Sequence, residues 1–347
     1  MKRSLRRRIL RWTTRLAAAL LIVLVALLAA GFAWDQIASR GFESKHPAPG
    51  RKVALPDGRN LHFVIKGEGE PTLVLEAGAG GPHTDWGLVI DELAEATRVI
   101  AYDRAGYGWS DPSPGSGSAA ITADLSDGLA ALGVNGPIVL VGHSIGGPYI
   151  RQYASKHMDQ VAGLVFIDSS HEDQVNRMPP PMVEMMRTMT AVVQAAAFAS
   201  RFGLLRALDA LGANPFAMED MPQERRAMSL RSSTTRAYAR EIGGIESTLA
   251  ETRSTPTTYD NLPILVLSAT AQDASEAPPA IREHFDEFKA AWSEMQAELA
   301  RLSSNSRHVP VPDAGHYIQF DRPDVVIEEI KGMVEAIRNG APLSPGG

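Results

Sequence analysis

The sequence predicts an α/β protein built on a mostly parallel, doubly wound sheet. Short apolar runs recur along the chain with helix-length gaps between them, and Gly, Asp or Pro bounds each run. Such runs indicate buried parallel strands, because a strand covered by helices on both faces lacks the polar alternation of a half-exposed strand. The runs are Thr72–Leu75, Arg98–Tyr102, Ile138–Val141, Gly163–Ile167, Ile264–Ser268 and Arg307–Val311.

An antiparallel hairpin precedes these strands. Two apolar-leaning segments, Lys52–Leu55 and Asn60–Ile65, flank the sequence Pro-Asp-Gly-Arg at 56–59. Proline presets φ for a turn and glycine accepts a positive φ, so this tetrapeptide favours a chain reversal. We therefore expect the folded domain to cover residues 51–339 and to leave 340–347 as a tail.

One gap between predicted strands is too long for a simple crossover. About 95 residues separate Ile167 from Ile264, whereas a parallel connection needs only a dozen or more. Within the gap, residues 182–211 have a helical and apolar pattern, which indicates a helical cap insertion over about 172–260. Methionine is concentrated there, which suits either an adaptable apolar pocket or ordinary helix packing. These methionines are Met178, Met182, Met185, Met186, Met189, Met218, Met221 and Met228.

The N-terminal segment predicts a transmembrane signal anchor. Residues 1–15 are basic and contain no acid, and residues 16–34 then carry no charge before Asp35. As a helix, the uncharged run would span about 28 Å, close to the hydrocarbon thickness of a bilayer. We expect a cytoplasmic N-terminus, a linker over 35–50 and an extracytoplasmic catalytic domain. The alternative is a cleaved signal peptide and a secreted domain, because Ala30 and Ala33 offer small residues near a cleavage point.

The charge distribution argues against nucleic acid as a partner. Seven of the 34 Lys and Arg residues lie in the first fifteen positions, so the remaining chain has an excess of acid over base. An acidic surface repels a phosphate backbone. The chain has no cysteine, which neither requires nor excludes an oxidising compartment.

The strongest functional signal is the sequence Gly142-His143-Ser144-Ile145-Gly146. It directly follows the predicted strand Ile138–Val141 and precedes a helical pattern over 148–157. A serine becomes nucleophilic when a tight strand-to-helix turn presents its hydroxyl beside a base, and flanking glycines let that turn close. Ser144 is therefore the predicted nucleophile, and His143 is expected to have a structural role.

Two further loops complete the predicted site. Glycines at 78, 80 and 81 follow the run Thr72–Leu75, where the chain must expose backbone N–H groups. The amides of Ala79 and Ile145 are the expected oxyanion donors, although a tight turn alone would also account for the glycines. His316 follows the last predicted strand, in the loop that lies beside the nucleophile turn in this architecture. It is the predicted general base.

With these motifs, the chain resembles the α/β-hydrolase family over roughly residues 51–339. The segment 103–110, Asp-Arg-Ala-Gly-Tyr-Gly-Trp-Ser, is similar to the family's D-R-x-G-x-G-x-S turn. Ala77 departs from the family pattern, because a histidine is common at that place. The resemblance implies an α/β-hydrolase fold with a helical cap and a Ser-His-Asp triad.

The resemblance leaves two candidates for the triad acid, because the family's carboxylate follows either the sixth or the seventh strand. Asp273 lies five residues past the strand that ends at Ser268, which is similar to the commoner arrangement. Asp168 directly follows Ile167, as the acid does in some branches of the fold. Either carboxylate would orient the His316 imidazole and stabilise its charged form.

The predicted function is hydrolysis of a carboxylic ester or similar acyl compound, with a small apolar substrate and an acyl-serine intermediate. Alternatives on the same fold are C–C bond cleavage, amide or peptide hydrolysis, perhydrolysis and a noncatalytic ligand-binding module. Ser144 argues against dehalogenase and epoxide hydrolase chemistry, for which an aspartate nucleophile is expected. The sequence has no zinc, P-loop or dinucleotide motif, so we expect no cofactor and no metal.

Overall fold

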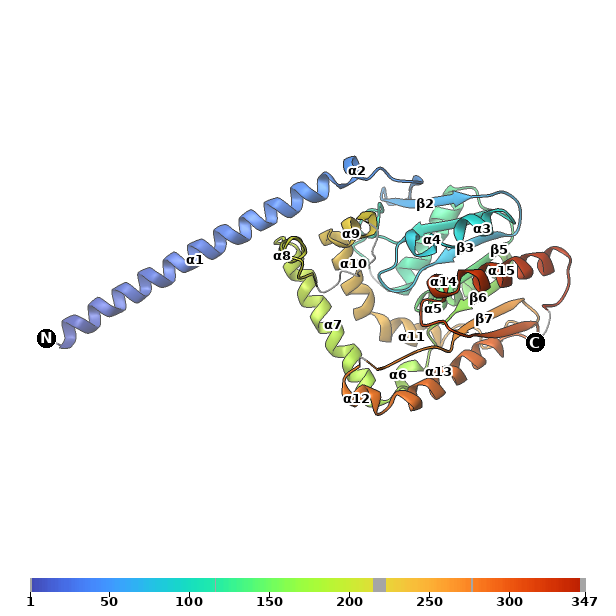
Figure 1. Cartoon of the computed structure of the whole chain (residues 1–347). Helices are drawn as coiled ribbons and strands as arrows, with labels where there is room; N and C mark the ends of the chain where they lie inside the picture. Colours follow the sequence, from blue (N-terminus) through green and yellow to red (C-terminus); the bar gives the residue numbers. More distant parts are fainter. Residues whose placement is uncertain (1, 116, 215–222, 276, 344–347) are drawn as a thin grey trace. The chain divides into compact units, whose positions relative to one another are not determined.

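A computed structural model describes residues 2–115, 117–214, 223–275 and 277–343 (Figure 1). Met218 and Met221 of the predicted cap and residues 344–347 of the predicted tail lie outside the described residues. The chain divides into two compact units. The first consists of residues 1–47 and 195–235, and the second of residues 48–194 and 236–347.

The second unit contains an eight-stranded sheet with the order β1-β2-β4-β3-β5-β6-β7-β8. The pairs β1–β2 and β2–β4 are antiparallel, and every other neighbouring pair is parallel. The predicted hairpin and mostly parallel sheet are therefore confirmed. The strands are β1 (Arg51–Ala54), β2 (Asn60–Lys66), β3 (Thr72–Glu76), β4 (Val99–Asp103), β5 (Ile138–His143), β6 (Val161–Ile167), β7 (Ile264–Ala269) and β8 (Ser306–Val311).

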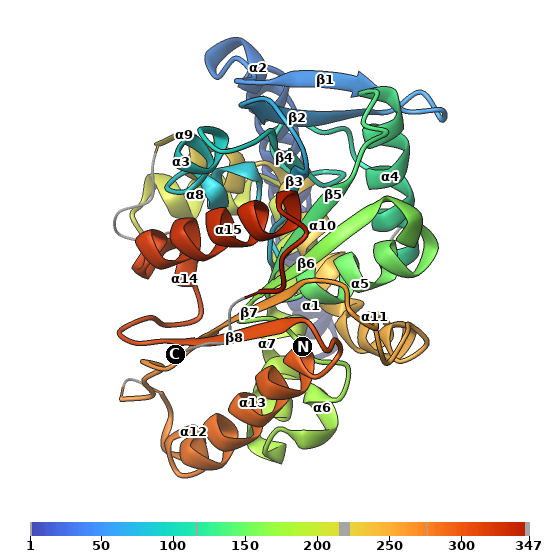
Figure 2. The same ribbon diagram turned by 90° about the vertical axis from the view of Figure 1, so that its right-hand side faces the viewer.

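Helices cover both faces of this sheet, and Figure 2 shows α3 and α15 on the opposite side from α4 and α5. Alternate residues of a strand point to opposite faces. In β5, Ile138 and Leu140 accordingly pack in one hydrophobic core, whereas Val139 and Val141 pack in the other. The helices of the first core are α4 (Ser118–Ala131), α5 (Gly146–Lys156) and α13 (Phe285–Ala300), and those of the second are α3 (Ile90–Ala94), α14 (Ile318–Asp321) and α15 (Pro323–Arg338).

The long interval between β6 and β7 is helical, as the sequence predicts. The division into compact units groups its middle part, residues 195–235, with the N-terminal helix. Its helices are α6 (Gln174–Arg177), α7 (Pro180–Ser200), α8 (Leu204–Ala210), α9 (Gln223–Ser229), α10 (Ser232–Gly243) and α11 (Ile245–Thr252). Shorter elements elsewhere are η1 (His83–Trp86), η2 (Met158–Gln160) and α12 (Pro279–Arg282).

The first unit begins with α1 (Lys2–Arg40), which is long and apolar enough to cross a membrane. This helix continues into the expected linker 35–50, and α2 (Phe42–Lys45) follows it, so most of residues 35–45 are helical. A charge such as Asp35 ends an apolar run but does not end a helix, and the first prolines after the run are Pro47 and Pro49. The Asp35 side chain is fully buried in this unit and pairs with Arg206.

Candidate functional site

Ser144 lies on the turn between β5 and α5. Its φ is +54°, in the left-handed region that side chains rarely adopt, and such strain is concentrated at functional sites. The turn also requires glycine on both sides of Ser144. A Cβ at Gly142 would lie 2.7 Å from the backbone of Gly146, and one at Gly146 would lie 2.5 Å from the Glu76 carbonyl oxygen. The hydroxyl is therefore presented at the carboxyl end of the central strands, where open α/β sheets bind ligands.

A continuous chain of hydrogen bonds joins Ser144, His316 and Asp168. His316 Nε2 lies 3.0 Å from Ser144 Oγ, and His316 Nδ1 lies 2.7 Å from Asp168 Oδ2. The Asp168 carboxylate is fully buried. It also accepts hydrogen bonds from the Trp292 indole N–H at 2.9 Å and from the Ala269 amide at 3.0 Å. These donors hold the carboxylate in a fixed orientation toward the imidazole.

The structure does not bring Asp273 to His316. The Asp273 carboxylate is exposed and accepts hydrogen bonds from the Ser275 hydroxyl at 2.7 Å and the Ser275 amide at 2.9 Å. These bonds lower the pKa of Asp273. Of the two predicted acids, Asp168 is thus the one whose carboxylate contacts the imidazole, while Asp273 lines the adjoining pocket.

His143 supports His316 from the preceding strand. Its Nε2 lies 2.9 Å from the His316 carbonyl oxygen. Burial, together with the neighbouring His316, lowers the pKa of His143 to about 3, so the ring is neutral and its Nε2–H donates to that carbonyl. A Cβ at Gly78 would lie 2.7 Å from His143 Nδ1, so glycine at 78 leaves room for this ring. The contact gives His143 a positioning role for His316.

Ala79 and Ile145 line the same pocket as Ser144. Within the described residues, neither of their backbone N–H groups donates a hydrogen bond to the protein. The adjacent Gly80 N–H, by contrast, donates to Glu241 Oε2 at 3.1 Å. Two unpartnered amides beside a serine hydroxyl can receive a negative charge that develops on a bound carbonyl oxygen.

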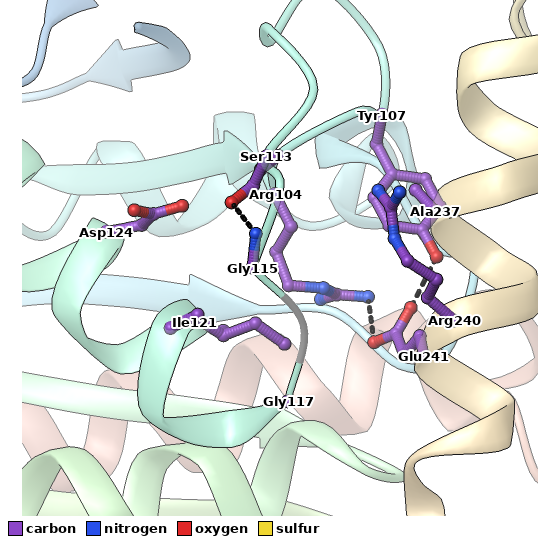
Figure 3. Close-up of a pocket in the computed structure, with 12 residues that line it drawn as sticks. Arg104, Tyr107, Ser113, Gly115, Gly117, Ile121, Asp124, Ala237, Arg240 and Glu241 are labelled. Carbon is purple, nitrogen blue, oxygen red and sulfur yellow. Dashed lines mark hydrogen bonds and ion pairs between the residues drawn. The ribbon is translucent and has the colours of Figure 1, made fainter. Parts of the chain in front are cut away.

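A buried ionic network holds the loop that follows β3. Arg104 donates to the carbonyl oxygens of Ala77 and Gly78, at 2.8 and 2.6 Å. Its guanidinium also pairs with Glu76 at 2.7 Å and with Glu241 at 2.9 Å, and Figure 3 shows the second pair. Burial raises the pKa of Glu76, and Arg104 opposes this effect. One cation therefore holds the loop backbone between two buried carboxylates.

Glu241 connects this loop to α10. Its carboxylate accepts hydrogen bonds from the hydroxyls of Tyr107 and Tyr149 as well as from the Gly80 amide. The hollow drawn in Figure 3 borders the network and measures only about 40 Å³. Such a volume holds only a few water molecules and is too small for a substrate, so the network supports the site.

A much larger cavity of about 540 Å³ opens at Ser144 and His316. This volume lies in the range of small-molecule sites. Met178 and Met186 line the cavity, Met182 and Met228 are buried, and Met185 and Met189 are exposed. Some of the described methionines of the insertion therefore serve the pocket and others the packing. The other large apolar lining residues are Ile145, Ile245, Phe285, Phe288 and Trp292.

A separate buried cluster consists of His62, His83 and Asp103, whose potential ligand atoms lie within 4.8 Å of one another. The Asp103 carboxylate accepts hydrogen bonds from His62 Nδ1 at 2.8 Å and His83 Nδ1 at 2.9 Å, and from the amides of His83 and Trp109. Burial acts to raise the pKa of Asp103, but the two histidines hold it well below its usual range. Because the Nδ1 atoms of both histidines already engage the carboxylate, the cluster fits a hydrogen-bonding hub better than a metal site.

Asp103→Asn is expected to lower the free energy of unfolding at pH 7 by about 3 kcal/mol, because it removes a buried charge and leaves its donors behind. A carboxylate with a depressed folded-state pKa stabilises the fold above its unfolded pKa, near 4. This contribution is lost as the pH falls through the folded-state value. The difference between wild type and variant should therefore shrink from about pH 5 downward.

Urea unfolding of the detergent-solubilised protein, at pH 7 and at pH 3, measures this difference. Asp127→Asn, at an exposed position of α4, is the matched control and should change stability little at either pH. An equal loss for Asp103→Asn at both pH values would show that the Asp103 charge is not the stabilising feature.

Several residues that build the site are not singled out by the sequence analysis. Arg104 belongs to the D-R-x-G turn at 103–106, and this motif is the only sequence pattern that points to its contacts with the loop after β3. Glu241 and Trp292 lie in helices with no motif around them. Glu241 is 161 residues away in sequence from its partner Gly80, and Trp292 is 124 residues away from its partner Asp168. No local pattern in the sequence predicts such contacts.

A family model described as "Alpha/beta hydrolase family" matches residues 73–329. The chain is 26% identical to a thermophilic esterase from Thermogutta terrifontis, with a TM-score of 0.58 over 83% of this chain and 98% of the esterase. An epoxide hydrolase from metagenomes of hot environments shares the fold at 21% identity and a TM-score of 0.56, over 82% of this chain and 97% of that one. "Probable transporter efuK" of Hormonema carpetanum is 27% identical over 77% of this chain, which spans only 40% of that relative. Because the family model covers most of its length, the chain belongs to the alpha/beta hydrolase family.

Proposed function

We propose that the protein is a serine hydrolase that cleaves carboxylic esters through an acyl-serine intermediate. The observation that carries this proposal is the hydrogen-bonded chain Ser144–His316–Asp168 at an apolar cavity. The fold alone does not select the reaction, since both an esterase and an epoxide hydrolase share it. A serine at the nucleophile turn favours acyl transfer over epoxide opening, for which we expect a carboxylate nucleophile.

In the proposed reaction, Ser144 Oγ attacks the ester carbonyl carbon while His316 Nε2 takes the hydroxyl proton. The amides of Ala79 and Ile145 stabilise the tetrahedral oxyanion. His316 then gives the proton to the leaving alcohol as the C–O bond breaks. A water molecule, deprotonated by the same imidazole, attacks the acyl-serine and releases the carboxylic acid. Asp168 stabilises the imidazolium that forms in each half-reaction.

The protein is further proposed to act while anchored in a membrane by α1, with its catalytic domain on the extracytoplasmic side. The support is the uncharged run 16–34, which follows a basic segment, within a helix long enough to cross a bilayer. A secreted form would lose most of this helix. The close contact of Gly31 with the backbone of Phe202, in the same compact unit, favours an uncleaved helix.

The test of the proposed reaction is pre-steady-state kinetics with p-nitrophenyl esters of increasing acyl length and the matching p-nitroanilides. We expect a burst of one nitrophenolate per protein, as acylation outpaces deacylation, and faster acylation by apolar acyl chains that fill the cavity. Anilides should react at least about 100-fold more slowly. Faster anilide turnover would indicate an amidase, and tight ester binding without turnover would indicate a binding module.

Glu241→Gln is expected to lower kcat for the preferred ester by about 10- to 100-fold, because the loop that carries Ala79 loses its charged acceptor and shifts from its position. KM should change less, since Glu241 does not line the cavity. Arg240→Gln, at the neighbouring position of α10, is the control and should stay within about twofold. Equal kcat values for the two variants would show that the network does not position the loop.

A further inference from the structure

The first compact unit contains a sharp helical corner, defined here as residues 198–211. It joins the end of α7 to α8, and the two helices meet at 94°. Gly203 makes the turn with a φ of +71°, which suits glycine. The corner is part of the same compact unit as α1, so its contacts with that helix bear directly on where it lies relative to a bilayer.

The corner packs against α1 inside the predicted membrane span. A Cβ at Gly31 would lie 2.1 Å from the carbonyl oxygen of Phe202, and one at Gly203 would lie 3.0 Å from the carbonyl oxygen of Gly31. The backbones of α1 and of the corner therefore touch at a place where each segment has a glycine. Gly31 lies within the uncharged run and precedes Asp35 by about 6 Å along the helix axis. The corner is thus held at the depth where the span ends.

A buried ion pair fixes the same contact on its polar side. Arg206 of α8 lies 3.0 Å from Asp35, whose side chain has no exposed surface, and donates a further hydrogen bond to Ser39 at 3.2 Å. A carboxylate near the bilayer boundary is costly unless it is paired. The pair neutralises the Asp35 charge through Oδ1, while Oδ2 has no hydrogen-bond partner among the described residues, and it ties α8 to α1 just beyond the uncharged run.

The corner also carries large apolar side chains that are not covered by other described residues. Phe198, Leu204 and Leu211 are 64%, 46% and 80% exposed, and the basic residue Arg201 is exposed between the first two. Aromatic and leucine side chains with an adjacent cation are typical of segments that lie in the membrane interface. In water, three such side chains on one short corner would be unfavourable.

We propose that the corner 198–211 is a second lipid-contacting surface, which inserts Phe198, Leu204 and Leu211 into the interfacial layer of the bilayer that α1 spans. This inference rests on the proposed anchor and adds a contact that the anchor alone does not require. It makes this part of the insertion between β6 and β7, residues 198–211, a membrane-bound element. The partner of the corner is a lipid surface rather than another protein.

The absence of cysteine permits a direct depth measurement on the full chain. Single substitutions Phe198→Cys, Leu204→Cys and Leu211→Cys are labelled with the fluorophore NBD, and the protein is reconstituted in phosphatidylcholine vesicles that contain shallow (5-doxyl) or deep (12-doxyl) quenching lipids. Val25→Cys, at the centre of the uncharged run, reports the span itself. Ser44→Cys, exposed in α2, is the matched control outside the bilayer.

We expect the shallow quencher to reduce the fluorescence of at least two of the three corner labels at least twofold more than that of the Ser44 label. The deep quencher should reduce the fluorescence of the Val25 label. Corner labels quenched no more than the Ser44 label, beside a quenched Val25 label, would overturn the corner proposal and leave the anchor intact. An unquenched Val25 label would overturn both. Fluorophosphonate labelling of wild type in the same vesicles tests the proposed hydrolase independently.

Discussion

Ser144→Ala should lower kcat for ester hydrolysis by roughly 10⁶-fold, and His316→Ala should cause a loss of similar size. Without the hydroxyl no acyl-serine forms, and without the imidazole the hydroxyl keeps its proton. Because the two groups act as one unit, the kcat of the double variant should lie within about threefold of the kcat of either single variant. Steady-state turnover of the preferred p-nitrophenyl ester measures all three.

Ser155→Ala, at an exposed position of α5, is the control for removing a hydroxyl from the helix that follows the nucleophile turn. It should keep kcat within about twofold of wild type. Additive losses in the double variant would mean that Ser144 and His316 contribute separately, which contradicts a nucleophile activated by its base.

Asp168→Asn should lower kcat by about 10⁴-fold at neutral pH, because the amide cannot stabilise the imidazolium and favours the wrong tautomer of His316. Asp273→Asn is the matched substitution at the other predicted acid and should leave kcat within about threefold. Circular dichroism and thermal unfolding check that both variants fold. The reverse pattern would place the triad acid after β7 rather than after β6, with a loop rearrangement that brings Asp273 to His316.

The fold is predictable from the sequence because it depends on local patterns. The central parallel strands are short apolar runs such as Ile264–Ser268, because they are buried on both faces. The edge strand β8 is more polar and only partly buried. The N-terminal helix is harder to delimit. Asp35 ends the uncharged run, yet α1 continues to Arg40, because a charge can end an apolar run without ending a helix. The partner of Asp35, Arg206, lies 171 residues away, and such a distant contact is not visible in a local pattern.

The candidate site is predictable to the extent that its residues lie on strand-end turns. Ser144 and His316 have this position in the sequence, and the structure brings their side chains together. The acid stays ambiguous because Asp168 and Asp273 follow adjacent parallel strands and both reach the same edge of the sheet. In the structure the Asp168 carboxylate contacts His316, and the indole of Trp292 donates to that carboxylate from a remote helix.

The most direct test of an activated serine is covalent labelling of the full-length protein in detergent with a fluorophosphonate, followed by peptide mass spectrometry. Wild type should carry one adduct, on the peptide that contains Ser144. Ser144→Ala should carry none, and His316→Ala should react at least about 1000-fold more slowly. A folded wild type without an adduct, or with an adduct on another serine, would contradict the proposed mechanism.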